Sequence, residues 1–218
     1  MPGSTVLEDI RISRPGRGGT IPPPADGGEG DRGGGGDASV PRRAYFTGLT
    51  LGLAAILMFF MALTSAFIVR KGLGGDWQAL HPPQILWLNT ALLLASSATI
   101  EIARRKHAAQ DSGTFRGWWG ITTLLGLAFL AGQILAWRQL AAAGMFLAAN
   151  PSASFFYVFT GAHGVHLLGG VVALLYVAFR AWTHSRITQG TAVDLVAVYW
   201  HFMDGLWVFL FLLISLGR

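Results

Sequence analysis

The sequence predicts an all-α, polytopic membrane protein: a bundle of five transmembrane helices preceded by a disordered N-terminal tail. Apolar residues make up 52% of the 218 residues and charged residues only 12%, about half the roughly 25% usual in soluble chains. Five apolar stretches are each long enough to cross about 30 Å of hydrocarbon. The Gly- and Pro-rich segment before them has no periodic apolar face.

The five stretches cover residues 44–69, 84–102, 118–140, 154–180 and 193–216. Because lipid offers no partners to backbone N–H and C=O groups, we expect them to be helices. Residues 1–41 are predicted to be the disordered tail, which lacks the apolar core of a signal peptide, and residues 42–218 the membrane domain. Tryptophans near the ends of the spans are expected in the aromatic belt at the membrane surface: Trp77, Trp87, Trp118, Trp119, Trp137 and Trp182.

The basic residues predict the orientation. Twelve lie in the tail and in the loops on the same side, against four on the other side, so the positive-inside rule places the N-terminus in the cytoplasm and the C-terminus outside. This distribution accounts for the net charge of +5 without a nucleic-acid partner. The chain has no cysteine, which excludes disulfides, thiolate metal sites, iron–sulfur clusters and covalently attached haem.

Four ionisable residues lie in the interior of the predicted spans, away from their ends, where each is costly and needs a reason. They are His163 and His166 in the fourth span and His201 and Asp204 in the fifth. Each pair has i,i+3 spacing on one helical face, at similar depth, so we expect one buried polar cluster. Three roles are open for this cluster. Paired imidazoles suit a metal or haem, and rows of His and Asp suit a proton relay or ion site. A carboxylate hydrogen-bonded to imidazoles would instead hold two helices together as a polar clamp.

Three further polar residues are interpreted structurally. Asn89 and Gln133 are expected to make hydrogen bonds between helices. Asp194, at the start of the fifth span, is placed where a carboxylate favours the positive end of the helix dipole.

Two long motifs carry a family resemblance. The run from Tyr199 to Phe211 (YWHFMDGLWVFLF) resembles the C-terminal signature of subunit III of the haem–copper oxidases, and the run from Phe155 to His166 (FFYVFTGAHGVH) resembles an upstream block of the same family. The run from Met58 to Phe67 is similar to the family's first shared helix. The resemblance covers residues 44–216 and is to the five-helix bacterial form.

The resemblance implies an accessory, non-catalytic subunit of a proton-pumping respiratory terminal oxidase in the bacterial plasma membrane. Such a subunit binds no haem or copper, since these belong to subunit I; it sits beside subunits I and II, holds phospholipids and supports proton uptake. This leaves His163, His166, His201, Asp204 and Asp194 as structural residues in lipid or subunit contact, with no catalytic or metal site.

Two departures from the family pattern concern carboxylates. Ile56 and Ala136 stand where the family often has a buried acidic residue, so a proton-handling role of those carboxylates does not transfer to this chain.

Two alternatives to the oxidase remain: a subunit III-like component of a nitric oxide reductase, and an independent proton-coupled transporter.

Overall fold

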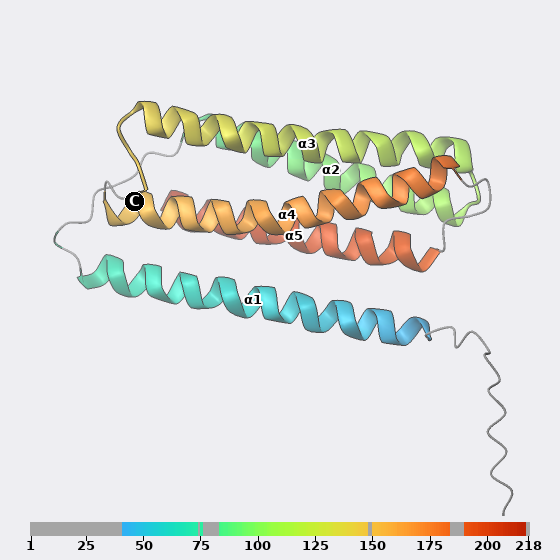
Figure 1. Cartoon of the computed structure of the whole chain (residues 1–218), viewed down its shortest axis with the longest axis horizontal. Coiled ribbons are helices and arrows are strands. Elements are labelled where there is room, and N and C mark those ends of the chain that lie inside the picture. Colours follow the sequence, from blue (N-terminus) through green and yellow to red (C-terminus); the bar gives the residue numbers. More distant parts are fainter. Residues whose placement is uncertain (1–40, 74, 76–82, 148–149, 184–189, 217–218) are drawn as a thin grey trace, which may run out of the picture. The chain divides into compact units, whose positions relative to one another are not determined.

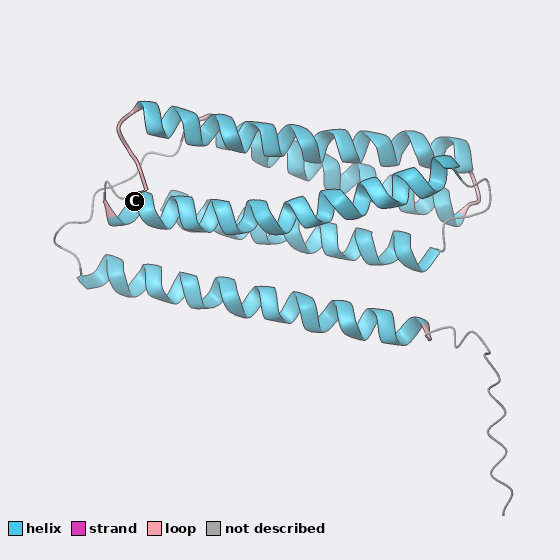
Figure 2. Ribbon diagram, in the orientation of Figure 1, coloured by secondary structure: helices cyan, strands magenta, loops and turns pink. Residues whose placement is uncertain are grey.

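The computed structural model describes residues 41–73, 75, 83–147, 150–183 and 190–216. All secondary structure in this part of the chain is α-helical (Figures 1 and 2). Five helices follow in order: α1 (Arg42–Leu73), α2 (Ile85–Ala108), α3 (Ser112–Ala142), α4 (Pro151–Thr183) and α5 (Gly190–Leu216). All five are long and apolar enough to cross a membrane, which confirms the predicted fold class. The predicted disordered tail lies outside the described residues, apart from Pro41.

The helices extend beyond the predicted apolar stretches. At its C-terminal end, α2 continues six residues beyond residue 102, to Ala108, through Arg104, Arg105 and Lys106. The apolar count stops where charges begin, whereas the helix continues because charged side chains are good helix formers and cations favour the C-terminal end. Charged residues therefore continue the helix at this end of α2.

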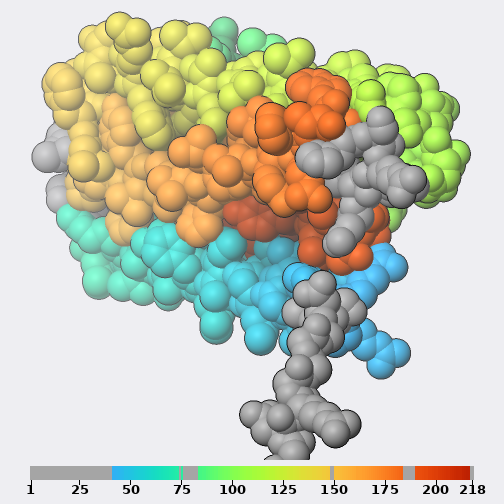
Figure 3. Space-filling model, turned by 45° about the vertical axis from the view of Figure 1, so that its right-hand side comes forward, coloured from blue at the N-terminus to red at the C-terminus, as the bar shows by residue number. Residues whose placement is uncertain are grey.

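Helices α2 to α5 pack as a four-helix group, and α1 lies along one side of it. The most extensive pairing is α2 with α3; α3 packs on α4, and α5 on both α2 and α4. α1 contacts α5 and α4 (Figure 1), and in Figure 3 its cyan and blue atoms form one edge, directly below those of α4 in orange. A narrow stripe of α1 is buried, containing Phe60, Thr64 and Phe67, so most of its surface remains open to lipid or another chain.

The connections before and after α3 are short, so α3 packs antiparallel to α2 and to α4. Asp111 precedes α3 and accepts a hydrogen bond from the backbone N–H of Thr114 at 3.2 Å, which caps the helix. The hydrogen bonds from Thr114 also lower the pKa of the Asp111 carboxyl below its usual range. After α3, Gly144 adopts a φ of +79°, the left-handed conformation that ends many helices, and turns the chain toward α4.

Four tryptophans join the helices from within. Each indole N–H donates to a group on another helix: Trp119 to the Leu174 carbonyl at 3.0 Å, Trp137 to Thr160 Oγ1 at 3.0 Å, Trp200 to Ser96 Oγ at 2.9 Å and Trp207 to Thr90 Oγ1 at 3.0 Å. The first two bonds link α3 to α4 and the last two link α5 to α2. A buried indole needs such a partner because lipid supplies none.

The expected place of Trp119 in the surface belt is wrong. Its side chain is only 1% exposed and packs inside the bundle beside Phe115. Trp87 and Trp182, by contrast, are 64% and 62% exposed, as a membrane-surface position requires. Adjacent residues on a helix point about 100° apart, so position near the end of a span does not distinguish a belt residue from a core residue.

The α2–α3 pairing depends on a glycine. A Cβ atom at Gly132 would lie 2.1 Å from the side-chain oxygen of Asn89, which is itself fully buried. Gly132→Ala is therefore expected to lower the free energy of unfolding by about 1–3 kcal/mol, the usual cost of overpacking. The midpoint of thermal unfolding in detergent measures this.

Gly120→Ala is the matched control on the same helix. No atom lies within 4 Å of its Cβ position, and alanine favours helix by up to about 1 kcal/mol relative to glycine, so this variant should be neutral or more stable. Equal destabilisation of both variants would show that the close approach at Gly132 does not limit helix packing.

Candidate functional site

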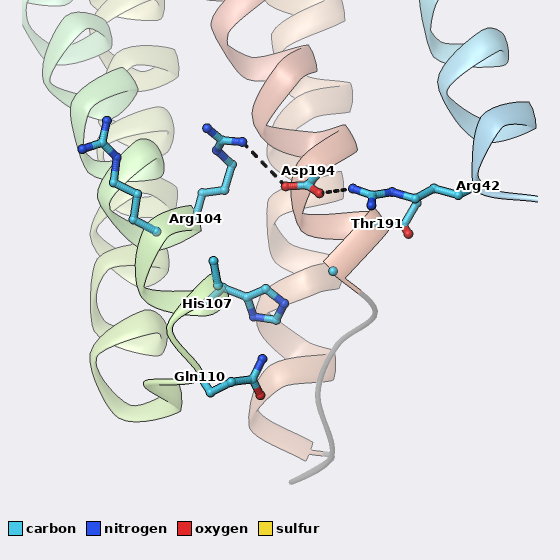
Figure 4. Close-up of a pocket in the computed structure, with 9 residues that line it drawn as sticks. Arg42, Arg104, His107, Gln110, Thr191 and Asp194 are labelled. Atoms are coloured by element: carbon cyan, nitrogen blue, oxygen red, sulfur yellow. Dashed lines mark hydrogen bonds and ion pairs between the residues drawn. The ribbon is translucent and has the colours of Figure 1, made fainter.

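A three-helix ion-pair cluster lies at the end of the bundle where α1 and α5 begin and α2 ends. Asp194 on α5 accepts a 2.6 Å hydrogen bond from the guanidinium of Arg42 on α1, and its other oxygen lies 3.8 Å from Arg104 on α2. Figure 4 shows the two arginines approaching the carboxylate from opposite sides. Glu101 bonds both Arg104 and Arg105 on its own helix, at 2.8 and 2.9 Å. We call Arg42, Arg104 and Asp194 the Asp194 clasp.

The position of Asp194 corrects the expectation that it begins α5. The helix starts at Gly190, and its first turn contains no acidic residue. Asp194 lies in the second turn, where the helix dipole is weak. Its contacts are therefore ionic contacts between helices, with Arg42 of α1 and Arg104 of α2, rather than contacts at the helix terminus.

A cavity of about 510 Å³ opens beside the clasp. His107 and Gln110, from the end of α2 and the following turn, and Thr191 of α5 contribute to its wall (Figure 4). Together with the arginines and Asp194, these groups make the cavity a polar entrance at the end of α2 and α5.

A second polar group lies deeper, between α5 and α2. The Nδ1 atom of His201 is 2.6 Å from the Ser97 hydroxyl oxygen, and the charges of Glu101 and Arg104 act on the same imidazole. Asp204, one turn further along α5, is 4% exposed. Neither of its oxygens has a hydrogen-bond partner among the described residues. We call His201, Ser97 and Asp204 the polar line, in which the hydrogen bond joins His201 and Ser97.

The two histidines of α4 lie apart from this line. His163 is fully buried, with its ring 5.1 Å from that of Trp207 and 5.9 Å from that of Phe129. His166 is half-buried, 5.8 Å from the ring of Phe60 on α1, and its Nδ1 atom donates to the carbonyl of Ala162 at 2.7 Å. The first therefore faces α3 and α5, and the second faces α1.

The single cluster that we expected does not form as a hydrogen-bonded unit among these four residues, and the expected bond from Asp204 to an imidazole is not made. Three residues of an α-helix turn the direction by about 300°, so an i,i+3 pair diverges by about 60°. In α5 both members still face α2. In α4 the same divergence directs His163 into the bundle and His166 toward α1.

Asn89 and Gln133 were expected to bond across helices, and that expectation is wrong. Both are at least 98% buried, yet none of their side-chain nitrogen and oxygen atoms has a hydrogen-bond partner in the described part of the chain. Both ring nitrogens of His163 likewise have no hydrogen-bond partner among the described residues. Helix spacing shows that a side chain is buried, but it does not show what the side chain faces.

Within the described residues, no three or more His, Cys, Asp or Glu side chains converge as metal ligands would. The imidazoles of His163, His166 and His201 therefore lie in separate places in the bundle.

Ser96, Ser97 and Thr90 were missed in the sequence. All three lie on α2 and meet side chains of α5: Ser97 meets His201, while Ser96 and Thr90 accept the Trp200 and Trp207 indoles. A small hydroxyl residue inside an apolar span carries no special signal by itself. The available signal is the i,i+7 recurrence of Thr90 and Ser97, which places both on the same face.

The membrane helices match a known family along their whole length. The family model described as cytochrome c oxidase subunit III matches residues 37–216, which includes all five helices, the Asp194 clasp and the His201–Ser97–Asp204 line. The chain belongs to the cytochrome c oxidase subunit III family.

Curated relatives give the same result. The chain is 35% identical over 181 residues to a probable cytochrome c oxidase subunit 3 of Nocardia farcinica, covering 78% of this chain and 87% of the relative. A probable subunit 3 of Mycobacterium tuberculosis is 36% identical with the same coverage. The cytochrome c oxidase subunit 3 of Synechocystis is 32% identical over 175 residues, covering 78% and 74% of the two chains.

The two positions that depart from the subunit III pattern, Ile56 and Ala136, also lie in apolar surroundings. Ala136 is fully buried on α3, and Ile56 packs against the core from α1. Neither position can titrate. Any proton exchange inside this bundle must therefore use other groups.

The clasp gives a testable prediction. Asp194→Asn removes the charge that holds Arg42 and Arg104. Because the side chains of Arg42, Arg104 and Asp194 are 62%, 45% and 27% exposed, we expect a loss of about 1 kcal/mol or less, which high salt should abolish. Thermal unfolding at low and high ionic strength measures both.

Arg105→Gln is the control for this prediction. Arg105 pairs with Glu101 four residues earlier on the same helix and joins no two helices, so its salt-dependent effect should be smaller. A loss for Asp194→Asn that persists in high salt would contradict an ionic origin.

Proposed function

We propose that this chain is the accessory, non-catalytic subunit III of a proton-pumping respiratory terminal oxidase. The observation that carries the proposal is the match to subunit III across residues 37–216, which coincides with the five-helix bundle. The haem and copper centres of such an oxidase would belong to subunit I, with which this chain would assemble together with subunit II. Its location would be the bacterial plasma membrane, with the N-terminus cytoplasmic and the C-terminus outside.

The polar residues support a structural role within this assembly. Asp194 joins three helices, and His201 bonds Ser97 of α2, so both hold α5 in place. His166 lies half-buried beside α1, the helix with the least buried surface. We assign these residues, with His163 and Asp204, to helix packing and to contact with subunits or lipid.

Phospholipid binding is part of this proposal. An apolar groove of about 610 Å³ runs between α1 and α5. Phe67 and Ile68 of α1 line it on one side, Phe209 and Leu212 of α5 on the other, and Lys71 lies at the α1 end. A groove of this lining fits an acyl chain, with the ammonium group at the level of a lipid phosphate.

Purification of the tagged chain in mild detergent tests the assembly. A reduced-minus-oxidised visible spectrum of the eluate should show haem bands, together with a large co-purifying membrane subunit. A chain that purifies intact, alone and colourless would contradict the proposal and favour an independent transporter. A haem-bearing partner that reduces nitric oxide rather than oxygen would favour the nitric oxide reductase alternative.

Filling the groove tests lipid binding. Leu212→Trp places an indole where the acyl chain is proposed to lie, so phospholipid retained per purified complex should fall by about one molecule. Quantitative lipid mass spectrometry measures this. Leu124→Trp is the control, because Leu124 is 66% exposed on α3, outside the groove. Unchanged lipid content in Leu212→Trp would overturn the assignment.

A further inference from the structure

The cavity beside the Asp194 clasp, which we call the clasp cavity, is rich in arginine. Arg42 of α1 and Arg104 and Arg105 of α2 line it. Among the described residues of the lining, Asp194 is the one acidic side chain. The cavity therefore collects guanidinium groups from two helices around a single carboxylate, as Figure 4 shows for Arg42 and Arg104.

The charges of this lining do not cancel. Three guanidinium groups and one carboxylate leave a surplus of two positive charges. Glu101, which pairs with Arg104 and Arg105 from their own helix, reduces the surplus to one. A concave site that retains positive charge attracts anions.

The three arginines also keep hydrogen-bond donors for a ligand. A guanidinium group has five N–H donors. Asp194 accepts one hydrogen bond from Arg42, and Glu101 accepts two from Arg104 and one from Arg105. These carboxylates therefore use a minority of the donors. All three arginine side chains are exposed, so the other donors are accessible from the cavity.

Neutral polar groups and the start of α5 complete the wall. His107 and Gln110 come from the end of α2 and the turn after it, and Thr191 comes from the first turn of α5 (Figure 4). A Cβ atom at Gly190 would lie 3.6 Å from Nε2 of His107, so the start of α5 closely approaches the imidazole. The first turn of α5 contains no acidic residue, and the positive end of its helix dipole adds to the charge of the arginines.

We propose that the clasp cavity binds a phosphate ester. Arginine recognises phosphate through paired N–H···O bonds, and here guanidinium groups approach from two helices. The volume of about 510 Å³ is in the range of small-molecule sites, so it accommodates the phosphate and the group esterified to it. A soluble phosphate ester and the head group of an anionic phospholipid share this chemistry. The proposal goes beyond the proposed function, because it requires no partner subunit.

Thermal unfolding in detergent tests the site, with glycerol 3-phosphate as the probe. The sample is the purified protein with whichever subunits accompany it. The unfolding midpoint should rise and then saturate as the probe is added, because a ligand that binds the folded state stabilises it. Sodium chloride at the same ionic strength is the reference, since it reproduces charge screening without the phosphate group.

Arg105→Gln is the test variant. Arg105 lines the cavity but pairs with Glu101 of its own helix, outside the Asp194 clasp, so the variant should keep nearly the basal midpoint. It should weaken probe binding about tenfold, which corresponds to about 1.4 kcal/mol. Arg43→Gln is the matched control, because it removes a charge beside Arg42 at a position outside the described lining. This control should bind the probe as the unmodified protein does.

Lipid content separates the two sources of the ester. The protein is incubated with phosphatidylglycerol in mixed micelles and repurified, and the retained lipid is measured by quantitative mass spectrometry. If the ester is a lipid head group, Arg105→Gln should retain less phosphatidylglycerol than Arg43→Gln. If the ester is soluble, glycerol 3-phosphate raises the midpoint while the two variants retain equal lipid.

Two results would overturn the proposal. One is that neither the probe nor phosphatidylglycerol distinguishes Arg105→Gln from the unmodified protein. The other is an equal loss of binding in Arg43→Gln, which would indicate a general attraction of anions to this end of the bundle. Neither result depends on haem co-purification, so failure of this site is distinguishable from failure of the proposed function.

Discussion

Lipid offers no hydrogen-bond partner, and this constraint organises the interior of the bundle. Each of four tryptophans places a large apolar ring between helices and donates its indole N–H to a group on a neighbouring helix. The apolar ring contributes packing. The single N–H donor of the indole determines which helix it bonds and the register of the two helices along their axes. The bonds from Trp200 to Ser96 and from Trp207 to Thr90 fix the register of α5 on α2, and that register brings His201 against Ser97.

α1 is attached by different forces from the other helices. It contributes a narrow buried stripe, with Phe67 packing edge-to-face on Phe155 of α4 at 5.5 Å, and its N-terminal end is held by Arg42 on Asp194. None of the four indole bonds reaches it. The ionic contact adds a polar attachment at one end of the helix to this apolar packing. This combination leaves most of α1 available to lipid or to a partner helix.

The sequence predicted the number of helices, their order and the buried ionisable residues, because apolar length and isolated charges are strong signals in a membrane protein. It did not predict what those residues face. Asn89 and Gln133 occupy positions typical of interhelical bonding, yet their side-chain polar atoms have no hydrogen-bond partner among the described residues. Ser97 carries no signal until α5 places His201 beside it. These outcomes depend on helix rotation by a few tens of degrees, which periodicity does not resolve.

Aromatic side chains close the interior of the bundle beyond Asp204. One turn beyond Asp204, the Trp207 indole commits its only proton donor to Thr90, and its ring packs at 4.9 Å from that of Phe129. His163 lies behind these rings, with neither nitrogen bonded in the described structure. An indole N–H cannot accept a proton, so the polar line stops at Asp204.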